Sequence, residues 1–396
     1  MKARVGIDAT FLERDGRYTG MGVYTRGIAT GLAEVAEGDE IVLLGYGPRP
    51  ADLPEAIGWE RMARLPAGRA SLWASHQIVL PRIARRLNLD LVHVPGVNLR
   101  LSQPGVPFWL PCPLVVTVHD AIPVSYYGVV GPALPWRLRV GYQVALLAVR
   151  RASVVFTVSE TSRRDILAHL RIQSARLRVV YNGLETPGAA NEGRDRATLA
   201  RLGVFPPYLL YAGSFEPRKN LLGAVFAYRD ALKRRALPDL VLLVERESGH
   251  RAAVLAEVTA SGIDHGLRFV HSLSDDELTT LYRHASIFLA PSRSEGFGFA
   301  PLQALALGVP VIAARAGALP EVLGDAARYV DPTSVEEWAT AIVELVDQPA
   351  WAAELGARGP ARAACFRWST AACQILDEYR RIAARRPRPA APPIRR

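Results

Sequence analysis

A carboxylate followed by a glycine-rich turn is the most chemically informative pattern in this chain. Glu295 precedes a turn whose residues are Gly296, Phe297, Gly298 and Phe299. A short helix with Pro301 in its first turn is predicted next. The first N–H groups of a helix lack partners and its dipole is positive there, so this turn suits a phosphate or a sugar hydroxyl. Glu295 would accept hydrogen bonds from neutral hydroxyl groups, and the combination suits a sugar nucleotide.

A second motif places two cations where a helix is expected to begin. The apolar run 208–212 predicts a strand, and it leads into Gly213, Ser214 and the segment Glu216-Pro217-Arg218-Lys219-Asn220. Cations in the first turn of a helix oppose its dipole, so Arg218 and Lys219 gain little there unless they bind an anion. The alternative is that both are solvated loop residues.

A third motif is the dipeptide His119-Asp120, which follows a predicted strand at 114–118. A histidine at the carboxyl end of a strand could hydrogen-bond a substrate hydroxyl and tune its protonation. The alternative for a single histidine is a structural role. Glycines also follow the first predicted strand, where Gly20 and Gly22 are expected to form a turn before a helix.

Strands and helices are predicted to alternate along the whole chain, which positions these motifs at strand ends. Strands are expected in the first half at 4–9, 41–45, 91–94, 114–118, 154–158 and 178–181, and in the second at 208–212, 240–244, 268–270, 287–290, 309–313 and 327–330. This alternation predicts an α/β fold with mostly parallel, doubly wound sheets. Residues 183–195 lack periodicity and are predicted to link two halves. Ligands of open sheets bind at the carboxyl ends of the strands, so the site is expected in a cleft there.

Size, charge and cysteine content narrow the classes of protein. A length of 396 residues predicts two domains, and 49% hydrophobic residues are typical of globular chains. The net charge of +10 is compatible with anionic substrates, nucleic acid or an anionic membrane. Without an RNA-binding or zinc signature, nucleic-acid binding is not predicted, and the three cysteines indicate neither a disulfide framework nor a metal site. Without a leader or a long apolar run, a cytoplasmic protein is expected.

Taken in their order along the chain, these motifs resemble the motifs of the retaining glycosyltransferases of family four, which have the GT-B fold. The segments 116–123 and 211–220 are similar to the bacterial branch that adds mannose to surface polysaccharides, and Phe366-Arg367-Trp368-Ser369 resembles the family's final crossing. The resemblance implies two Rossmann-like domains facing across a cleft. Residues 1–187 would bind the acceptor and 188–367 the nucleotide sugar. A helix at 368–384 would return to the first domain, and 385–396 would be a disordered basic tail.

The resemblance also implies roles for the motif residues. Arg218 and Lys219, after Gly213 and Ser214, would bind the donor diphosphate and neutralise the leaving group. The backbone of 296–299 would hold phosphate and sugar, and Glu295 would contact the sugar hydroxyls. His119, followed by Asp120, would lie near the reacting carbon, and Gly20 and Gly22 would allow close approach of phosphate or acceptor.

Two positions depart from the family pattern. The family usually has a second glutamate that binds the ribose, and this chain has Gln303. A neutral acceptor makes a weaker hydrogen bond than a charged one, so weaker donor binding is predicted, without loss of activity. Charged residues also occupy 245–247, where the family often has a glycine near the nucleotide base. These charged residues could crowd or rewire base recognition, so the sequence leaves the base open between guanine and uracil.

The implied reaction moves a hexose, mannose in the first place, from a GDP- or UDP-linked donor to a hydroxyl of a glycan or lipid-linked acceptor. It would serve cell-surface polysaccharide or lipopolysaccharide synthesis, with retention of configuration and without a metal or cofactor. An epimerase or phosphorylase on the same scaffold and a non-catalytic partner of a transferase remain as alternatives. Basic and aromatic residues of the first half, Arg137 and Arg139 among them, could also contact an anionic membrane at the inner face of the cell.

Overall fold

The computed structural model divides the chain into two compact units. Unit 1 comprises Met1–Gly183 with Arg367–Arg396, and unit 2 comprises Leu184–Phe366. The structure describes residues 2–13, 20–64, 71–97, 105–128, 136–185, 188–244, 249–263 and 265–385. Each unit is an α/β domain built on a parallel sheet, so the predicted fold class is confirmed. Of the predicted tail at 385–396, residues 386–396 lie outside the described part, and so do the charged residues 245–247.

Unit 1 contains a parallel sheet of seven described strands. Along the chain they are β1 (Arg4–Asp8), β2 (Glu40–Gly45), β3 (Gly58–Arg61), β4 (Leu91–Val94), β5 (Leu114–Thr117), β6 (Val154–Thr157) and β7 (Leu177–Val179). In the sheet their order is β3-β2-β1-β4-β5-β6-β7. Every residue of β4, β5 and β6 is buried, because helices cover both faces of a parallel sheet.

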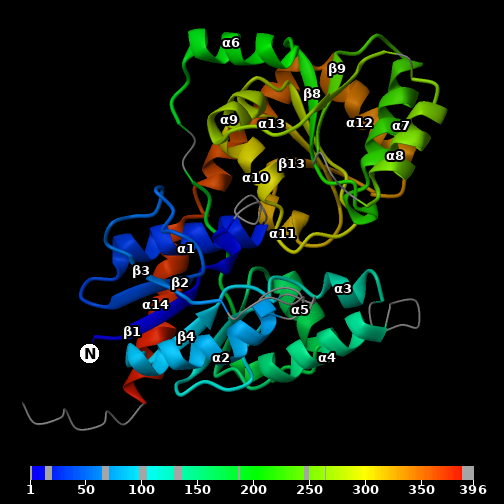
Figure 1. Ribbon diagram of the computed structural model, residues 1–396. Coiled ribbons are helices and arrows are strands. Elements are labelled where there is room, and N and C mark those ends of the chain that lie inside the picture. The colour runs from blue at the N-terminus through cyan, green and yellow to red at the C-terminus, as the bar shows by residue number, and fades with distance from the viewer. Residues whose placement is uncertain are drawn as a thin grey trace, which may run out of the picture. The chain divides into compact units, whose positions relative to one another are not determined.

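Helices cover the sheet of unit 1 on both sides (Figure 1). They are α1 (Gly20–Val35), α2 (Ser71–Arg86), α3 (Ile122–Ser125), α4 (Trp136–Val149), α5 (Glu160–His169) and α14 (Trp368–Ala384), with 3-10 turns at Thr10–Leu12 and Ser174–Arg176. α14 packs closely on α1 because α1 carries glycines at the contact. A Cβ atom added to Gly27 would lie 1.9 Å from the Trp368 ring, and one on Gly31 would lie 2.3 Å from the Trp368 carbonyl oxygen.

Unit 2 contains a parallel sheet of six described strands: β8 (Tyr208–Gly213), β9 (Asp239–Val244), β10 (Leu267–Val270), β11 (Ile287–Ala290), β12 (Val311–Ala314) and β13 (Ala327–Val330). Their order in the sheet is β10-β9-β8-β11-β12-β13. The chain therefore moves outward in one direction from β8 and in the other from β11. The loops that leave these two neighbouring strands diverge at a topological switch point, where open sheets bind ligands.

The helices of unit 2 are α6 (Glu192–Leu202), α7 (Leu221–Leu232), α8 (Arg251–Ala260), α9 (Asp275–Arg283), α10 (Phe299–Ala306), α11 (Leu319–Leu323), α12 (Val335–Asp347) and α13 (Pro349–Ala363), with a 3-10 turn, η4, at Pro217–Lys219. Trp338 of α12 is among the largest fully buried side chains. The buried residues of the strands in unit 2 are mostly Val, Ile and Leu.

Two expectations about elements were wrong, and one strand was not predicted. Residues 183–195 are not all linker, since α6 begins at Glu192 with the Asn191 side chain accepting from Arg194 N at 3.0 Å. The charged residues of α6 interrupt the apolar periodicity by which a helix is predicted. Gly20 and Gly22 lie inside α1 and not in a turn before it. The short edge strand β3 was missed because it has no apolar run, and none of its residues is fully buried.

Candidate active site

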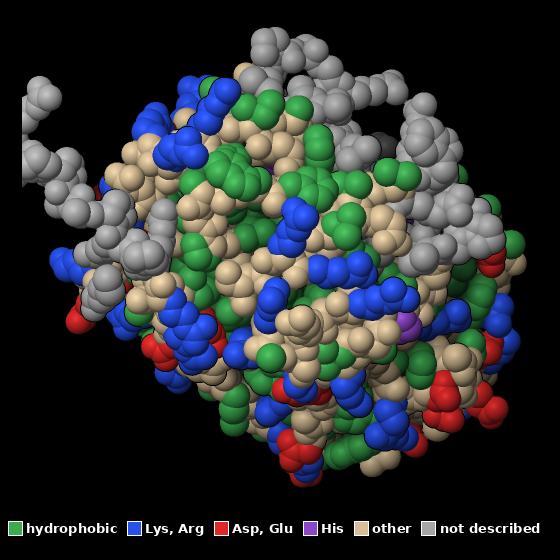
Figure 2. Space-filling view, turned by 90° about the horizontal axis from the view of Figure 1, so that it is seen from below, with side chains coloured by type: hydrophobic (Ala, Val, Ile, Leu, Met, Phe, Trp, Pro, Cys, Tyr) green, Lys and Arg blue, Asp and Glu red, His purple; other side chains and the backbone are tan. Residues whose placement is uncertain are grey.

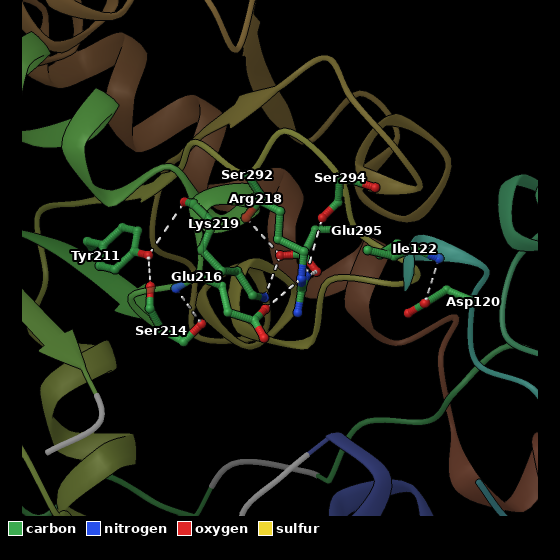
Figure 3. A network of polar contacts seen from close by, with 10 residues as sticks. All are labelled: Asp120, Ile122, Tyr211, Ser214, Glu216, Arg218, Lys219, Ser292, Ser294 and Glu295. Carbon is green, nitrogen blue, oxygen red and sulfur yellow. Dashed lines mark hydrogen bonds and ion pairs between the residues drawn. The ribbon is translucent and has the colours of Figure 1, made fainter. Parts of the chain in front are cut away.

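The loops after β8 and β11 meet at Glu295. Lys219 Nζ lies 2.6 Å from Glu295 Oε1, and Arg218 Nη1 lies 3.2 Å from Glu295 Oε2 (Figure 3). Ser292 Oγ donates a hydrogen bond of 2.7 Å to Glu295 Oε1. Unit 2 thus brings together the two cations and the carboxylate that the sequence singled out in separate motifs, at its topological switch point.

Both cations are held in place by carboxylates. Arg218 Nε also bonds Glu216 Oε2 at 2.8 Å, and the Lys219 and Arg218 side chains are about one-fifth exposed, at 22% and 20%. Burial alone would raise the pKa of Glu295, but the charges of Lys219 and Arg218 and the hydrogen bonds from Lys219 and Ser292 hold it below its ordinary value. Glu295 is therefore ionised at neutral pH, and the cluster is preorganised for an anion or for hydroxyl groups.

Tyr211 and Asn220 shape the loop that carries the cations. The Tyr211 hydroxyl donates to the Ser214 carbonyl oxygen at 3.1 Å, and a Cβ atom on Gly213 would lie 2.6 Å from that hydroxyl. Asn220 has a left-handed backbone, with φ of 54°, and its amide donates to the carbonyl oxygens of Pro291 and Pro332. Sequence analysis assigned Asn220 no role. The available signal was that asparagine tolerates this conformation.

Gly317 is a second residue that sequence analysis missed. It has φ of +55°, and a Cβ atom there would lie 2.5 Å from Glu295 N and 2.6 Å from Glu295 O. The next residue, Ala318, donates its N–H to Glu295 O at 2.9 Å. The loop after β12 therefore fixes the backbone of Glu295 by direct contact, and only glycine fits at this point.

The glycine turn forms the start of α10, as predicted. Gly298 is its N-cap with φ of 102°, and Gly296 precedes it by two residues. The Phe297 side chain is buried and packs edge-on against Phe299 at 5.2 Å and against Phe366 at 5.6 Å. Phe297 can therefore offer a ligand only its backbone. Gln303 lies half-buried on α10.

In unit 1, His119 follows β5 and is half-buried. Its Nε2 lies 2.9 Å from the Pro95 carbonyl oxygen, so Nε2 carries the proton and Nδ1 is left as an acceptor. Burial lowers the pKa of His119 to about 4, although the bond to Pro95 opposes this shift. His119 is therefore neutral at pH 7. Asp120 Oδ1 accepts a hydrogen bond of 3.0 Å from the N–H of Ile122, the first residue of α3.

A buried chain of hydrogen bonds supports His119. His93 Nδ1 lies 2.5 Å from the Tyr379 hydroxyl, and His93 Nε2 lies 2.8 Å from Thr117 Oγ1. Thr117 in turn meets the Tyr24 hydroxyl at 2.9 Å, and the Tyr24 ring packs edge-on against His119 at 4.8 Å. Burial, and then the nearby His119, lower the pKa of His93 to about 3. This series of hydrogen bonds links β4, β5, α1 and α14, and it was not predicted from the sequence.

Comparison with known proteins gives the family. Residues 18–187 match the family model described as Glycosyltransferase Family 4, and residues 202–362 match the one described as Glycosyl transferases group 1. The O-antigen chain mannosyltransferase B of Escherichia coli is 31% identical over 288 residues, which are 70% of this chain and 73% of that one. This chain belongs to glycosyltransferase family 4. The resemblance found in the motifs is thereby confirmed.

Other similar proteins agree with this family 4 assignment. The MMP alpha-(1->4)-mannosyltransferase of Mycolicibacterium hassiacum is 31% identical over 362 residues, covering 85% of this chain and 82% of that one. The sucrose-phosphate synthase of Thermosynechococcus elongatus has a similar fold, with a TM-score of 0.75 at 20% identity over 97% of this chain and 100% of that chain. Anabaena HepE in complex with UDP-glucose has a TM-score of 0.71 at 16% identity, covering 96% and 99%. The GT-B architecture is confirmed.

Among the helices that the structure describes, none has the length and apolar content that a membrane crossing requires.

Proposed function

We propose that this family 4 glycosyltransferase moves a hexose, mannose in the first place, from a GDP- or UDP-linked donor to a hydroxyl of a glycan or lipid-linked acceptor, with retention of configuration. The observation that carries the proposal is the cluster of Arg218, Lys219 and Glu295 beside the start of α10. Two of the similar proteins are mannosyltransferases by name, and HepE holds UDP-glucose in this fold.

The leaving group of such a donor is a nucleoside diphosphate, on which negative charge grows as the sugar departs. Arg218, Lys219 and the positive end of the α10 dipole would stabilise that charge more strongly in the transition state than in the ground state. Because the cations are already held by Glu295 and Glu216, they need little reorganisation when the donor binds. These groups can neutralise the diphosphate without a metal ion, so we propose a metal-independent reaction.

Glu295 is better suited to binding the sugar than to attacking it. Its Oε1 already receives bonds from Lys219 and Ser292, and its Oε2 receives one from Arg218. A carboxylate stabilised in this way is a weak nucleophile, whereas its remaining lone pairs can accept from sugar hydroxyls. We therefore propose front-face transfer, in which an oxygen of the leaving phosphate takes the proton of the acceptor hydroxyl.

In unit 1, we propose that His119 accepts a hydrogen bond from a hydroxyl of the donor sugar through Nδ1. Its lowered pKa supports this role, since a neutral imidazole can accept such a bond. Gly20 supports a ligand role for the start of α1. A Cβ atom there would have no atom of the described residues within 4 Å, so packing does not require glycine at this position.

We also propose that unit 1 contacts an anionic membrane from the cytoplasmic side. Ile78, Arg82 and Arg85 share one face of α2, and Trp109 is 58% exposed with the Arg85 guanidinium 5.6 Å from its ring centroid. Figure 2 shows Lys and Arg side chains among exposed hydrophobic ones on this side of the molecule. The side chains of Arg137 and Arg139, expected to join this surface, lie outside the described residues. Arg82→Gln with Arg85→Gln should weaken sedimentation with anionic liposomes, and Arg358→Gln should not.

A panel of nucleotide sugars tests the proposed reaction. The purified protein is incubated with each donor, with and without a mannose-terminated acceptor, and the anomeric configuration of the product is read by NMR. Transfer with retention supports the proposal. A change in the donor alone indicates an epimerase, dependence on inorganic phosphate indicates a phosphorylase, and donor binding without transfer or hydrolysis indicates a non-catalytic partner.

A further inference from the structure

Unit 1 contains a cavity that the donor-site residues do not use. It has a volume of about 1090 Å³ and lies at the carboxyl ends of β2 and β3, beside the turn after β1. Its walls come from three segments of unit 1, namely 12–13, 46–50 and 61–64. Ligands of open parallel sheets bind at this edge, so the position suits a binding site.

Most of the hydrogen-bond acceptors in this cavity already receive hydrogen bonds from the protein. Glu13 is the one carboxylate among the residues that line it. Glu13 Oε1 accepts from the backbone N–H groups of Tyr46 and Gly47, and Glu13 Oε2 accepts from Arg64 at 3.0 Å. Arg49 is similarly occupied, because its guanidinium donates to three backbone carbonyl oxygens of residues 53–57. Neither residue has much capacity left for a ligand.

Arg61 and Arg64 supply donors that remain available. Arg61 uses Nε to bond the Tyr46 carbonyl oxygen at 3.3 Å, and its two terminal nitrogens bond no other described residue. Arg64 uses Nη2 for Glu13, and its guanidinium lies 5.2 Å from the centre of the Tyr46 ring. Both arginines are exposed. The cavity therefore presents guanidinium donors in excess of carboxylate, which is the chemistry that binds a phosphate.

The wall beneath these arginines is buried and is linked by polar contacts. Tyr46 is 4% exposed, and its hydroxyl lies 3.4 Å from His76 Nδ1. His76 Nε2 in turn lies 3.2 Å from Asp8 Oδ2, and both side chains are buried. Leu12, Met62 and two prolines complete the walls with apolar surface. The cavity can thus hold a phosphate attached to a larger body.

We propose that this cavity binds the phosphate or diphosphate group of the acceptor, a role that rests on the proposed transfer. The group could belong to a water-soluble sugar phosphate or to the diphosphate of a lipid carrier. In both cases Arg61 and Arg64 bind the anion, and the apolar walls contact the attached body.

Calorimetry on the full chain without donor tests binding to the cavity directly. The probes are mannose 6-phosphate and geranylgeranyl diphosphate, with methyl α-mannoside and geranylgeraniol as their uncharged matches. We expect at least one phosphorylated probe to bind about tenfold or more tightly than its match, and the probe that does so identifies the source. Arg61→Gln and Arg64→Gln should each weaken that binding about tenfold, since each removes a charge-assisted hydrogen bond. Arg164→Gln on α5 is the matched control and should bind as the unmodified chain does.

Equal binding of charged and uncharged probes, or unchanged binding by both variants, would overturn the proposal. Thermal unfolding and donor affinity are measured in parallel, and Arg61→Gln should leave both unchanged while raising the KM for a phosphorylated acceptor. If the chain proves not to transfer sugar at all, the binding arm still reports on the cavity. If only the cavity proposal is wrong, the chain still transfers sugar to uncharged acceptors. The unmodified chain and the two arginine variants then do so equally well.

Discussion

The candidate site residues of the two units differ in how their charge is controlled. In unit 2, Glu295 is ionised and paired with Arg218 and Lys219, so opposite charges lie within 3.2 Å of each other. In unit 1, His119 and His93 are kept neutral by burial, and their partners are a carbonyl group, hydroxyl groups and aromatic rings. The difference indicates that unit 2 suits a ligand that gains charge, whereas the His119 site suits one that stays neutral.

The largest effect is expected from Lys219→Ala, which removes one of the two cations that pair with Glu295 in unit 2. Loss of one preorganised donor typically raises a barrier by about 3 to 4 kcal/mol, so turnover should fall roughly a hundredfold or more. The measurement is steady-state transfer at saturating donor. Lys233→Ala is the control, because Lys233 is 66% exposed and pairs with Asp230 on α7. Near-normal turnover of the Lys219 variant would remove it from the proposed role.

Gly317→Ala should disturb Glu295 without altering any charge. The left-handed backbone alone costs a residue other than glycine about 1 to 2 kcal/mol, and the new methyl group would also press on Glu295 N. We expect lower stability to urea and weaker donor binding. Gly203→Ala is a matched control, since Gly203 has φ of +64° and open space around it. If both variants lose the same stability and bind donor equally, the contact between Gly317 and Glu295 does not affect donor binding.

The neutral side of the comparison predicts a pH dependence of stability. The folded chain keeps His93 and His119 unprotonated down to pH values of about 3 and 4, whereas unfolded histidines bind protons below about 6.5. The unfolded state therefore binds more protons in this window, and stability falls as pH drops from 6.5 towards 4. Each of these histidines contributes at most about 1.4 kcal/mol per pH unit. His93→Phe should flatten the dependence in urea titrations. An unchanged slope would show that His93 is protonated in the folded chain.

The smallest effect is expected from Gln303→Glu, which restores a charged acceptor on α10. We expect the donor to bind several-fold more tightly, because a charged acceptor makes the stronger hydrogen bond to a ribose hydroxyl. Fluorescence or calorimetric titration with the donor measures this change, with Gln348→Glu as a control for added negative charge. An unchanged dissociation constant would contradict the assignment of Gln303 to the ribose.

The sequence predicted the alternation of strands and helices well because buried parallel strands are continuous apolar runs, as in β11 and β12. It failed where burial is partial, as in β3, and where charge obscures a helical period, as in α6. Asp195 shows this second failure, since it was placed in a linker but is buried and bonds Thr280, Arg283 and His284.

For the candidate site, local motifs identified Glu295, Arg218 and Lys219 because each follows a strand within a recognisable turn. Residues that act through distant contacts gave no such signal. Gly317 meets Glu295 from another loop, and Tyr379 reaches His93 from a helix 286 positions away in the chain. Such contacts depend on how the chain folds back, which residue spacing alone does not encode.

The central claim is that Arg218 and Lys219, held by Glu295, bind the donor diphosphate. Calorimetric titration with GDP and UDP, compared with the corresponding monophosphates, tests it most directly. The account predicts that the unmodified chain prefers one diphosphate over its monophosphate, and that this preference is lost in Arg218→Ala and Lys219→Ala but kept in Lys233→Ala. A preference that survives in both site variants would contradict the account.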